Sequence, residues 1–167
     1  MKKKQENKKE LMEIFKFTMD DHLLRLNTDL IDLEKHPTSE QREELYRRML
    51  GEYHSIKGSA GTVGQTNVVD LTHELEDLLE MMRQGSLDGI VELFDLHYES
   101  LDAISLMIRC RLNGELFPEN VFKDLRQRIE QAKLAVMPKI RAWKTSVHHP
   151  NEGMNKRYIL RKGNRHG

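Results

Sequence analysis

The chain has 167 residues, 27 basic and 27 acidic side chains, one cysteine and a hydrophobic content of 38%. It contains no uninterrupted apolar stretch near the roughly 18–20 residues that a membrane-spanning helix needs, and its charged first residues do not resemble an export signal. We therefore expect a cytoplasmic protein with no membrane span, and the single Cys110 excludes an internal disulfide.

Four segments carry apolar side chains at steps of three and four, which is typical of helices that bury one face. Because the connections are short, these helices should pack as antiparallel neighbours, which predicts an all-α, up-and-down four-helix bundle over residues 10–114. The four stripes comprise Phe15, Met19, Leu23, Leu26, Leu30 and Leu33; Leu45, Met49, Tyr53, Ile56, Ala60 and Val63; Val68, Leu71, Leu75, Leu78, Leu79 and Met82; and Val91, Phe94, Tyr98, Leu101, Ile104 and Ile108.

Residues that favour helix starts and helix ends separate the four segments. The predicted ends, in chain order, are Pro37, Gly64, Gly85 and the pair Asn113–Gly114. The predicted caps at the starts of the second, third and fourth helices are Thr38 or Ser39, Thr66 or Asn67, and Ser86.

Residues 115–142 contain a fifth helical segment, which Pro118 should begin and Pro138 should interrupt. We expect this accessory helix to dock on the bundle, although a partner protein would cover its apolar stripe equally well. The stripe comprises Val121, Phe122, Leu125, Ile129, Ala132 and Val136.

The two ends of the chain are strongly charged. We expect residues 1–9 to form a charged extension and residues 143–167 a basic, flexible tail without an apolar period. Residues 139–167 hold eight basic residues and a single acidic one, Glu152, so the rest of the chain is acidic. An acidic body argues against nucleic acid as the main partner.

The second segment contains Gly58 and Gly61, although a glycine in a helix interior costs about 1 kcal/mol relative to alanine. At 100° per residue, His54, Lys57 and both glycines point away from the apolar stripe. A neutral, exposed imidazole has a ring-nitrogen lone pair that can accept a phosphoryl group, and a nearby lysine can stabilise the charge on its oxygens. Bare backbone beside the imidazole would let another protein approach closely.

The third segment places His73 and Glu76 together on the face opposite its apolar stripe. A carboxylate that accepts the Nδ1–H of His54 would leave Nε2 free for attack, so Glu76 is the predicted orienting group. His73 would lie beside the phosphorylated ring.

The run His-Ser-Ile-Lys-Gly-Ser-Ala-Gly at 54–61, followed by His-Glu-Leu-Glu at 73–76, resembles the histidine-containing phosphotransfer (HPt) domain. The closest resemblance is to the amino-terminal domain of chemotaxis-type histidine kinases, and it extends from about Phe15 to Leu112. It implies that His54 is the phosphoacceptor and that Glu76 is its hydrogen-bond partner. Lys57 and His73 would be the flanking groups. Gly58 and Gly61 would give a receiver the clearance to dock.

The resemblance also implies a histidine kinase and a response-regulator receiver as partners in two-component or chemotaxis-type signalling. No cofactor is expected in this chain, because the receiver would carry the divalent metal and the kinase would bind ATP. Nothing after residue 114 resembles a nucleotide site. The chain is therefore expected to be a stand-alone phosphocarrier or the front end of a kinase, and its classification as an enzyme stays open.

Other kinds of site fit the sequence less well. Di-iron bundles need paired Glu-x-x-His units, and His73-Glu74 lacks the second histidine of a zinc-binding His-Glu-x-x-His, so we expect no metal site. A nucleophilic Ser55 or Ser59 would need a base and an acidic group in register. The remaining alternative is a non-catalytic helical module that binds a partner helix through residues 121–136.

Overall fold

The computed structural model describes residues 2–85 and 90–148, and within them the chain forms five α-helices and no strand. The all-α prediction is confirmed. The predicted cap at Ser86 and residues 149–167 of the predicted tail lie outside the described residues. The helices are α1 (Lys2–Glu34), α2 (Ser39–Thr62), α3 (Thr66–Gly85), α4 (Val91–Asn113) and α5 (Glu119–His148).

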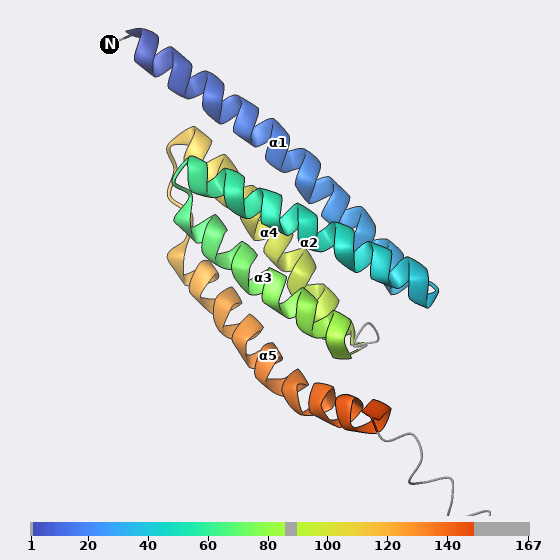
Figure 1. Cartoon of the computed structure of the whole chain (residues 1–167). Helices are drawn as coiled ribbons and strands as arrows, with labels where there is room; N and C mark the ends of the chain where they lie inside the picture. Colours follow the sequence, from blue (N-terminus) through green and yellow to red (C-terminus); the bar gives the residue numbers. More distant parts are fainter. Residues whose placement is uncertain (1, 86–89, 149–167) are drawn as a thin grey trace, which may run out of the picture.

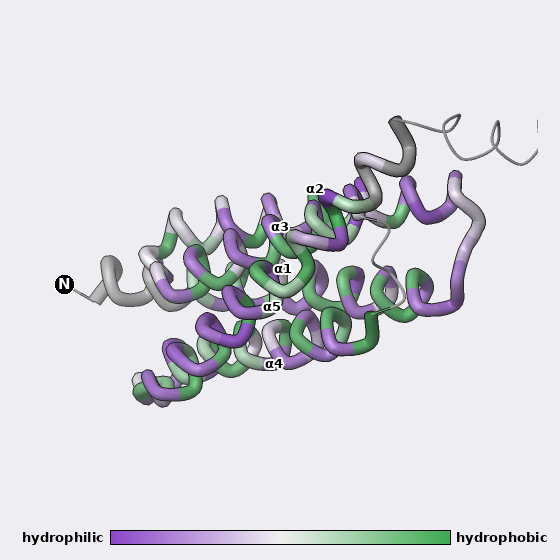
Figure 2. Tube along the Cα trace, turned by 90° about the horizontal axis from the view of Figure 1, so that it is seen from below, coloured by the Kyte–Doolittle hydropathy of each residue, from purple (hydrophilic) through white to green (hydrophobic). Residues whose placement is uncertain are grey.

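Consecutive helices from α1 to α4 run in opposite directions and pack side by side, as predicted for an up-and-down bundle (Figure 1). Helix α2 packs between α1 and α3, while α4 contacts both α1 and α3, and α5 is added against α3 and α4. Figure 2 shows hydrophobic and hydrophilic residues alternating in short stretches along the helices, as expected for helices that bury one face.

One continuous hydrophobic cluster fills the bundle, and it contains the predicted stripes of α1 and α3 in full. The prediction fails at Val91, which is 62% exposed at the start of α4. Tyr98 is only half-buried, because its hydroxyl reaches the surface and donates to Glu34 over 2.7 Å. The interior face of α4 instead includes Leu93 and His97, which the predicted stripe omitted.

The turns follow the predicted residues closely. Thr38, rather than Ser39, caps α2: its hydroxyl accepts from the backbone N–H of Gln41 over 3.3 Å, and its own N–H donates to the Gln41 side chain over 3.0 Å. Gly64 and Gly114 follow α2 and α4 with φ angles of 70° and 73°, a left-handed conformation that glycine adopts without a steric penalty. Helix α3 begins at Thr66 itself.

Helix α5 continues through Pro138, so the predicted interruption there is wrong. An interior proline removes its own N–H from the helical hydrogen bonds, and its ring also clashes with the carbonyl four residues earlier, so it bends a helix that packing holds in place. Val136 and Ile140, on either side of it, are buried and hold both halves of the helix against the bundle. Figure 1 shows α5 curving toward its C-terminal end. The helix begins at Glu119, one residue after the predicted Pro118.

Docking of the accessory helix on the bundle is confirmed by its burial and ion pairs. Lys133 bonds to Glu74 and lies 3.1 Å from Asp77, and Arg126 donates to Glu74 over 3.0 Å. Burial alone would raise the pKa of Glu74, but the two cations hold it below its usual value. The predicted stripe is buried at Phe122, Leu125, Ile129 and Val136, half-buried at Ala132 and 43% exposed at Val121.

Two predicted segment boundaries fall inside helices. Helix α1 begins at Lys2, so the charged extension continues directly into the bundle as helix, which suits its helix-favouring Lys, Glu and Gln residues. Helix α5 likewise runs past residue 142. Within the described residues, no helix combines the length and apolar content needed to cross a membrane.

Candidate functional site

His54 lies in the second half of α2 with 79% of its side chain exposed, as the helical spacing predicts. The residues around it on the other face, Tyr53 and Ile56, are completely buried in the core. Because buried neighbours fix the rotation of α2, the imidazole is held on the outside of a rigid helix.

Glu76 on α3 faces this imidazole. One carboxylate oxygen, Oε1, lies 3.8 Å from Nδ1 of His54, and the other oxygen, Oε2, forms an ion pair with Lys57. The prediction that Glu76 points outward needs correction, because only 16% of its side chain is exposed. A helical wheel gives the angle from the core stripe, but it does not show that α2 packs closely against α3 and covers this carboxylate.

The structure brings His54, Lys57 and Glu76 into one cluster, whereas none of the ion pairs that hold this cluster involves His73 in the described part of the chain. His73 lies exposed on α3, and in the described part of the chain no hydrogen bond or ion pair joins it to the cluster. Lys57 is directed to the carboxylate rather than to open solvent, with 29% of its side chain exposed.

Gly58 and Gly61 lie on the exposed face of α2, and the fold itself does not require either of them to be glycine. A Cβ atom added at Gly58 would meet nothing within 4 Å, and one at Gly61 would meet only a Val69 methyl group at 4.0 Å. Gly51, one turn before His54, is equally free of neighbours. Sequence reasoning missed Gly51, although its spacing of three residues from His54 places it on the same face.

The family model of the Hpt domain matches residues 10–133, which include the whole of this cluster and the first half of α5. The chain belongs to the Hpt domain family. The match begins inside α1 and ends inside α5. The first residues of α1 and the second half of α5 therefore lie outside the matched region.

Curated relatives of this Hpt domain are much longer proteins. The chain is 35% identical over 94 residues to "Chemotaxis protein CheA" of Halobacterium salinarum, covering 56% of this chain and 14% of that protein. It is 31% identical over 103 residues to "Chemotaxis protein CheA" of Bacillus subtilis, covering 62% and 15%. With "Sensor histidine kinase CheAY" of Helicobacter pylori it shares 29% identity over 106 residues, covering 63% and 13%. The chain therefore spans about one seventh of these relatives' length. No solved structure matches it.

A buried polar pair supports α2 directly behind the exposed histidine of this Hpt domain. The hydroxyl of Tyr53 lies 2.8 Å from Nδ1 of His97 on α4, and both side chains are completely buried. Burial raises the pKa of Tyr53 and lowers the pKa of His97 to about 3, so both groups are neutral. His97 falls between Phe94 and Leu101 of an apolar stripe, and that position is the signal by which the sequence could have indicated its burial.

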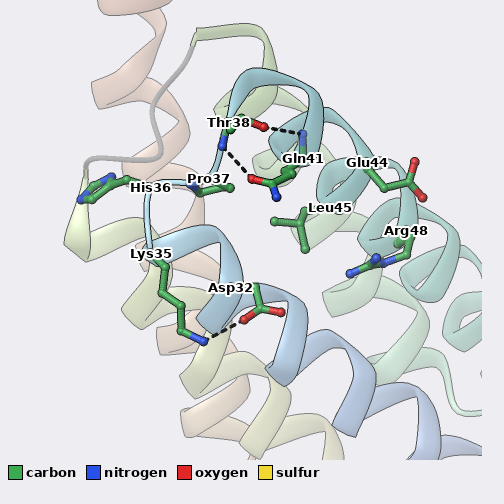
Figure 3. A pocket seen from close by; sticks show the side chains of 9 residues that line it. All are labelled: Asp32, Lys35, His36, Pro37, Thr38, Gln41, Glu44, Leu45 and Arg48. Carbon is green, nitrogen blue, oxygen red and sulfur yellow. Dashed lines mark hydrogen bonds and ion pairs between the residues drawn. The ribbon is translucent and has the colours of Figure 1, made fainter.

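A cavity of about 540 Å³ opens beside the loop between α1 and α2 (Figure 3), but its lysine and arginine are already paired with carboxylates. Lys35 donates to Asp32 over 2.9 Å, and Arg48 forms a two-pronged ion pair with Asp29. The cavity contains none of the predicted site residues and has no unpaired lysine or arginine for an anionic ligand. Among the residues that the structure describes, no three His, Cys, Asp or Glu side chains gather as metal ligands.

Proposed function

We propose that this Hpt domain is a cytoplasmic phosphocarrier of a two-component or chemotaxis-type pathway, with His54 as the phosphoacceptor. The supporting observation is the cluster itself: a largely exposed imidazole whose Nδ1 faces a partly buried carboxylate 3.8 Å away. A histidine kinase would supply the phosphoryl group, and the aspartate of a response-regulator receiver would accept it. A receiver can also donate the group in a relay.

The chemistry requires one neutral nitrogen with a lone pair and one N–H. Glu76 favours the tautomer that carries the proton on Nδ1, because a carboxylate stabilises an N–H that points toward it. Nε2 then attacks phosphorus, an N–P bond forms, and the P–O bond to the donor's leaving group breaks with its electron pair. Transfer to an aspartate reverses these changes.

Lys57 supports this arrangement through the same carboxylate. Its ammonium group pairs with Oε2 of Glu76, which leaves Oε1 for the imidazole. Once His54 carries a phosphoryl group, the same ammonium stabilises the phosphoryl oxygens by its charge. His73 stays a predicted flanking group, and its exposed position on α3 leaves it accessible to a bound partner.

The glycines provide clearance for the receiver. Gly58 and Gly61 each lower helix stability and serve no packing need within the chain, so the proposal assigns them to the approach of another protein's backbone. Gly51 extends this clear surface by one turn on the other side of His54. A receiver would then contribute its own aspartate and divalent metal to the transfer.

Two forms of the phosphocarrier fit the same site. The chain would act as a stand-alone carrier or as the amino-terminal phosphoacceptor of a chemotaxis-type kinase, since its relatives contain it as a small part of their length. The remaining alternative, a non-catalytic module that binds a partner helix through residues 121–136, has less support. Four of the apolar residues of that stripe are buried against the bundle.

Phosphorylation by a radiolabelled phospho-receiver or by a histidine kinase with ATP tests the proposal. Label on the wild-type chain should be labile in acid and stable in base, as phosphohistidine is, and His54→Gln should abolish it. His22→Gln is the control, because His22 lies on α1 and pairs with Glu52 instead. Label that persists in His54→Gln would refute the assignment.

A further inference from the structure

The outer face of α1 carries three large apolar side chains at intervals of seven residues. Phe17, Leu24 and Ile31 are 79%, 65% and 42% exposed. At 100° per residue they lie within about 40° of one another, on the opposite side of α1 from its buried stripe. A seven-residue interval keeps side chains on one seam when two helices pack side by side. We call these three residues the α1 stripe.

The α1 stripe lies away from the phosphotransfer cluster. His54 leans toward α3, where it faces Glu76, whereas α1 packs against a different side of α2 and has no close backbone contact with α3 in the described ranges. Figure 1 shows α2 lying between α1 and α3. A receiver docked over His54 and the glycines of α2 would therefore leave the α1 stripe uncovered.

We propose that the α1 stripe is the contact between two copies of this chain, which pack antiparallel about a two-fold axis at Leu24. In this arrangement Leu24 meets its own equivalent, and Phe17 of each copy meets Ile31 of the other. An isologous contact of this kind uses the same surface on both copies, and it closes after two chains. It buries all three apolar side chains of each copy.

Charges at the two ends of the stripe favour the antiparallel orientation. Glu13 lies on the same side of α1 as the stripe, before Phe17, and Lys35 directly follows the last residue of α1, beyond Ile31; both are exposed. Antiparallel packing places Glu13 of each copy beside Lys35 of the other, whereas parallel packing places like charges together. Lys35 also pairs with Asp32, but both side chains are largely exposed, so that pair is weak and can be shared.

The middle of the contact brings no uncompensated like charges together. Arg25 lies beside Leu24 and approaches its equivalent across the two-fold axis. It is already paired with Asp21, and it lies 3.4 Å from a carboxylate oxygen of Glu52. The stripe is only about 21 Å long, at 1.5 Å per residue from Phe17 to Ile31, so the expected dimer is weak and concentration-dependent.

Sedimentation velocity of the full chain over a wide concentration range tests the dimer. The wild type should shift reversibly from monomer to dimer, and Leu24→Glu should weaken association at least tenfold, because it places two carboxylates at the axis. Leu134→Glu is a matched control, since Leu134 on α5 is 64% exposed but lies outside the stripe. A chain that stays monomeric throughout, or a Leu24→Glu dimer as tight as the wild type, would overturn the proposal.

A charge exchange tests the orientation. Glu13→Lys and Lys35→Glu should each weaken the dimer, and the double variant should restore it, because each end again has opposite charges. Single variants that associate like the wild type would refute antiparallel packing. Labelling of His54 by a phosphodonor should be unchanged in all these variants, so failure of the dimer and failure of the phosphocarrier are separate results.

Discussion

The hydroxyl of Tyr53 lies 2.8 Å from Nδ1 of His97, in a completely buried position one residue before the exposed His54. The other ring nitrogen of His97, Nε2, is buried without a hydrogen-bond partner in the part of the chain that the structure describes. Loss of one partner of a buried polar pair lowers the free energy of unfolding, because the remaining group has no water with which to form a hydrogen bond. The orientation of α2, which keeps His54 exposed, thus depends in part on the hydrogen bond between Tyr53 and His97 on the buried face of the helix.

Tyr53→Phe should lower the free energy of unfolding by roughly 1–3 kcal/mol, because it keeps the ring but leaves Nδ1 of His97 without its partner. Urea unfolding at neutral pH measures this. Tyr98→Phe is the control: its hydroxyl bonds to Glu34 from a half-buried position, so water can replace the lost contact at a smaller cost. Equal losses in the two variants would contradict the special role of the buried pair.

The neutral form of His97 makes stability depend on pH. Burial lowers its pKa to about 3 in the folded chain, against about 6.5 in the unfolded chain. Below about pH 6.5 the unfolded state binds a proton that the folded state does not. Stability contributed by this group is therefore complete above that pH and falls toward pH 3, by up to about 1.4 kcal/mol per unit. Urea unfolding of wild type and His97→Gln at pH 7 and pH 5 should show a smaller loss in the variant.

Glu76→Gln should slow phosphorylation of His54 by roughly tenfold or more, because the amide no longer selects the tautomer with the proton on Nδ1. The free energy of unfolding should change by less than about 1 kcal/mol, since the carboxylate retains some solvent access and pairs with a surface lysine. Rapid-quench labelling and urea unfolding measure the two effects. Asp70→Asn, an exposed change on the same helix, should leave the labelling rate unaltered.

Gly58→Ala should raise the free energy of unfolding by about 0.5–1 kcal/mol, because the added Cβ meets nothing within 4 Å and alanine favours the helix. Gly64→Ala should do the opposite, since φ at Gly64 is +70°. Thermal unfolding compares the two.

Gly58→Leu tests the docking clearance separately. A bulky side chain one turn after His54 should slow transfer to or from a receiver while the fold remains stable. Transfer from a small-molecule phosphodonor needs no protein docking, so it should continue at the wild-type rate. A receiver reaction that is equally fast in both proteins would be evidence against the clearance.

Glu74→Gln should loosen α5, because Lys133 and Arg126 both bond to this carboxylate. The two cations hold the pKa of Glu74 below its usual value, despite burial that raises it. Its contribution to stability is therefore present above about pH 4.5 and is lost as the pH falls through the lower folded-state pKa. Hydrogen exchange at neutral pH should be faster in α5 of the variant and unchanged in α1. Uniform acceleration across the bundle would argue against a local effect.

The apolar spacing was sufficient to predict α1 to α4 and to place His54 outside, because a helix has one period and its buried stripe is visible in the sequence. The predicted burial of Val91 and the predicted helix interruption at Pro138 were wrong for the same reason. The spacing of apolar residues does not show where neighbouring helices begin to cover a residue. Leu93 replaces Val91 in the interior, and burial of Val136 and Ile140 carries α5 past the proline.

By itself, the sequence determined the all-α bundle, the exposed histidine and the pattern of the Hpt domain family, since these depend on local periodicity and on residue order. Only the tertiary structure decided that Glu76 is partly covered and shared between Lys57 and His54, and that His97 is buried against Tyr53. Those relationships join residues 19 to 44 positions apart, and their distances depend on how the helices pack against one another.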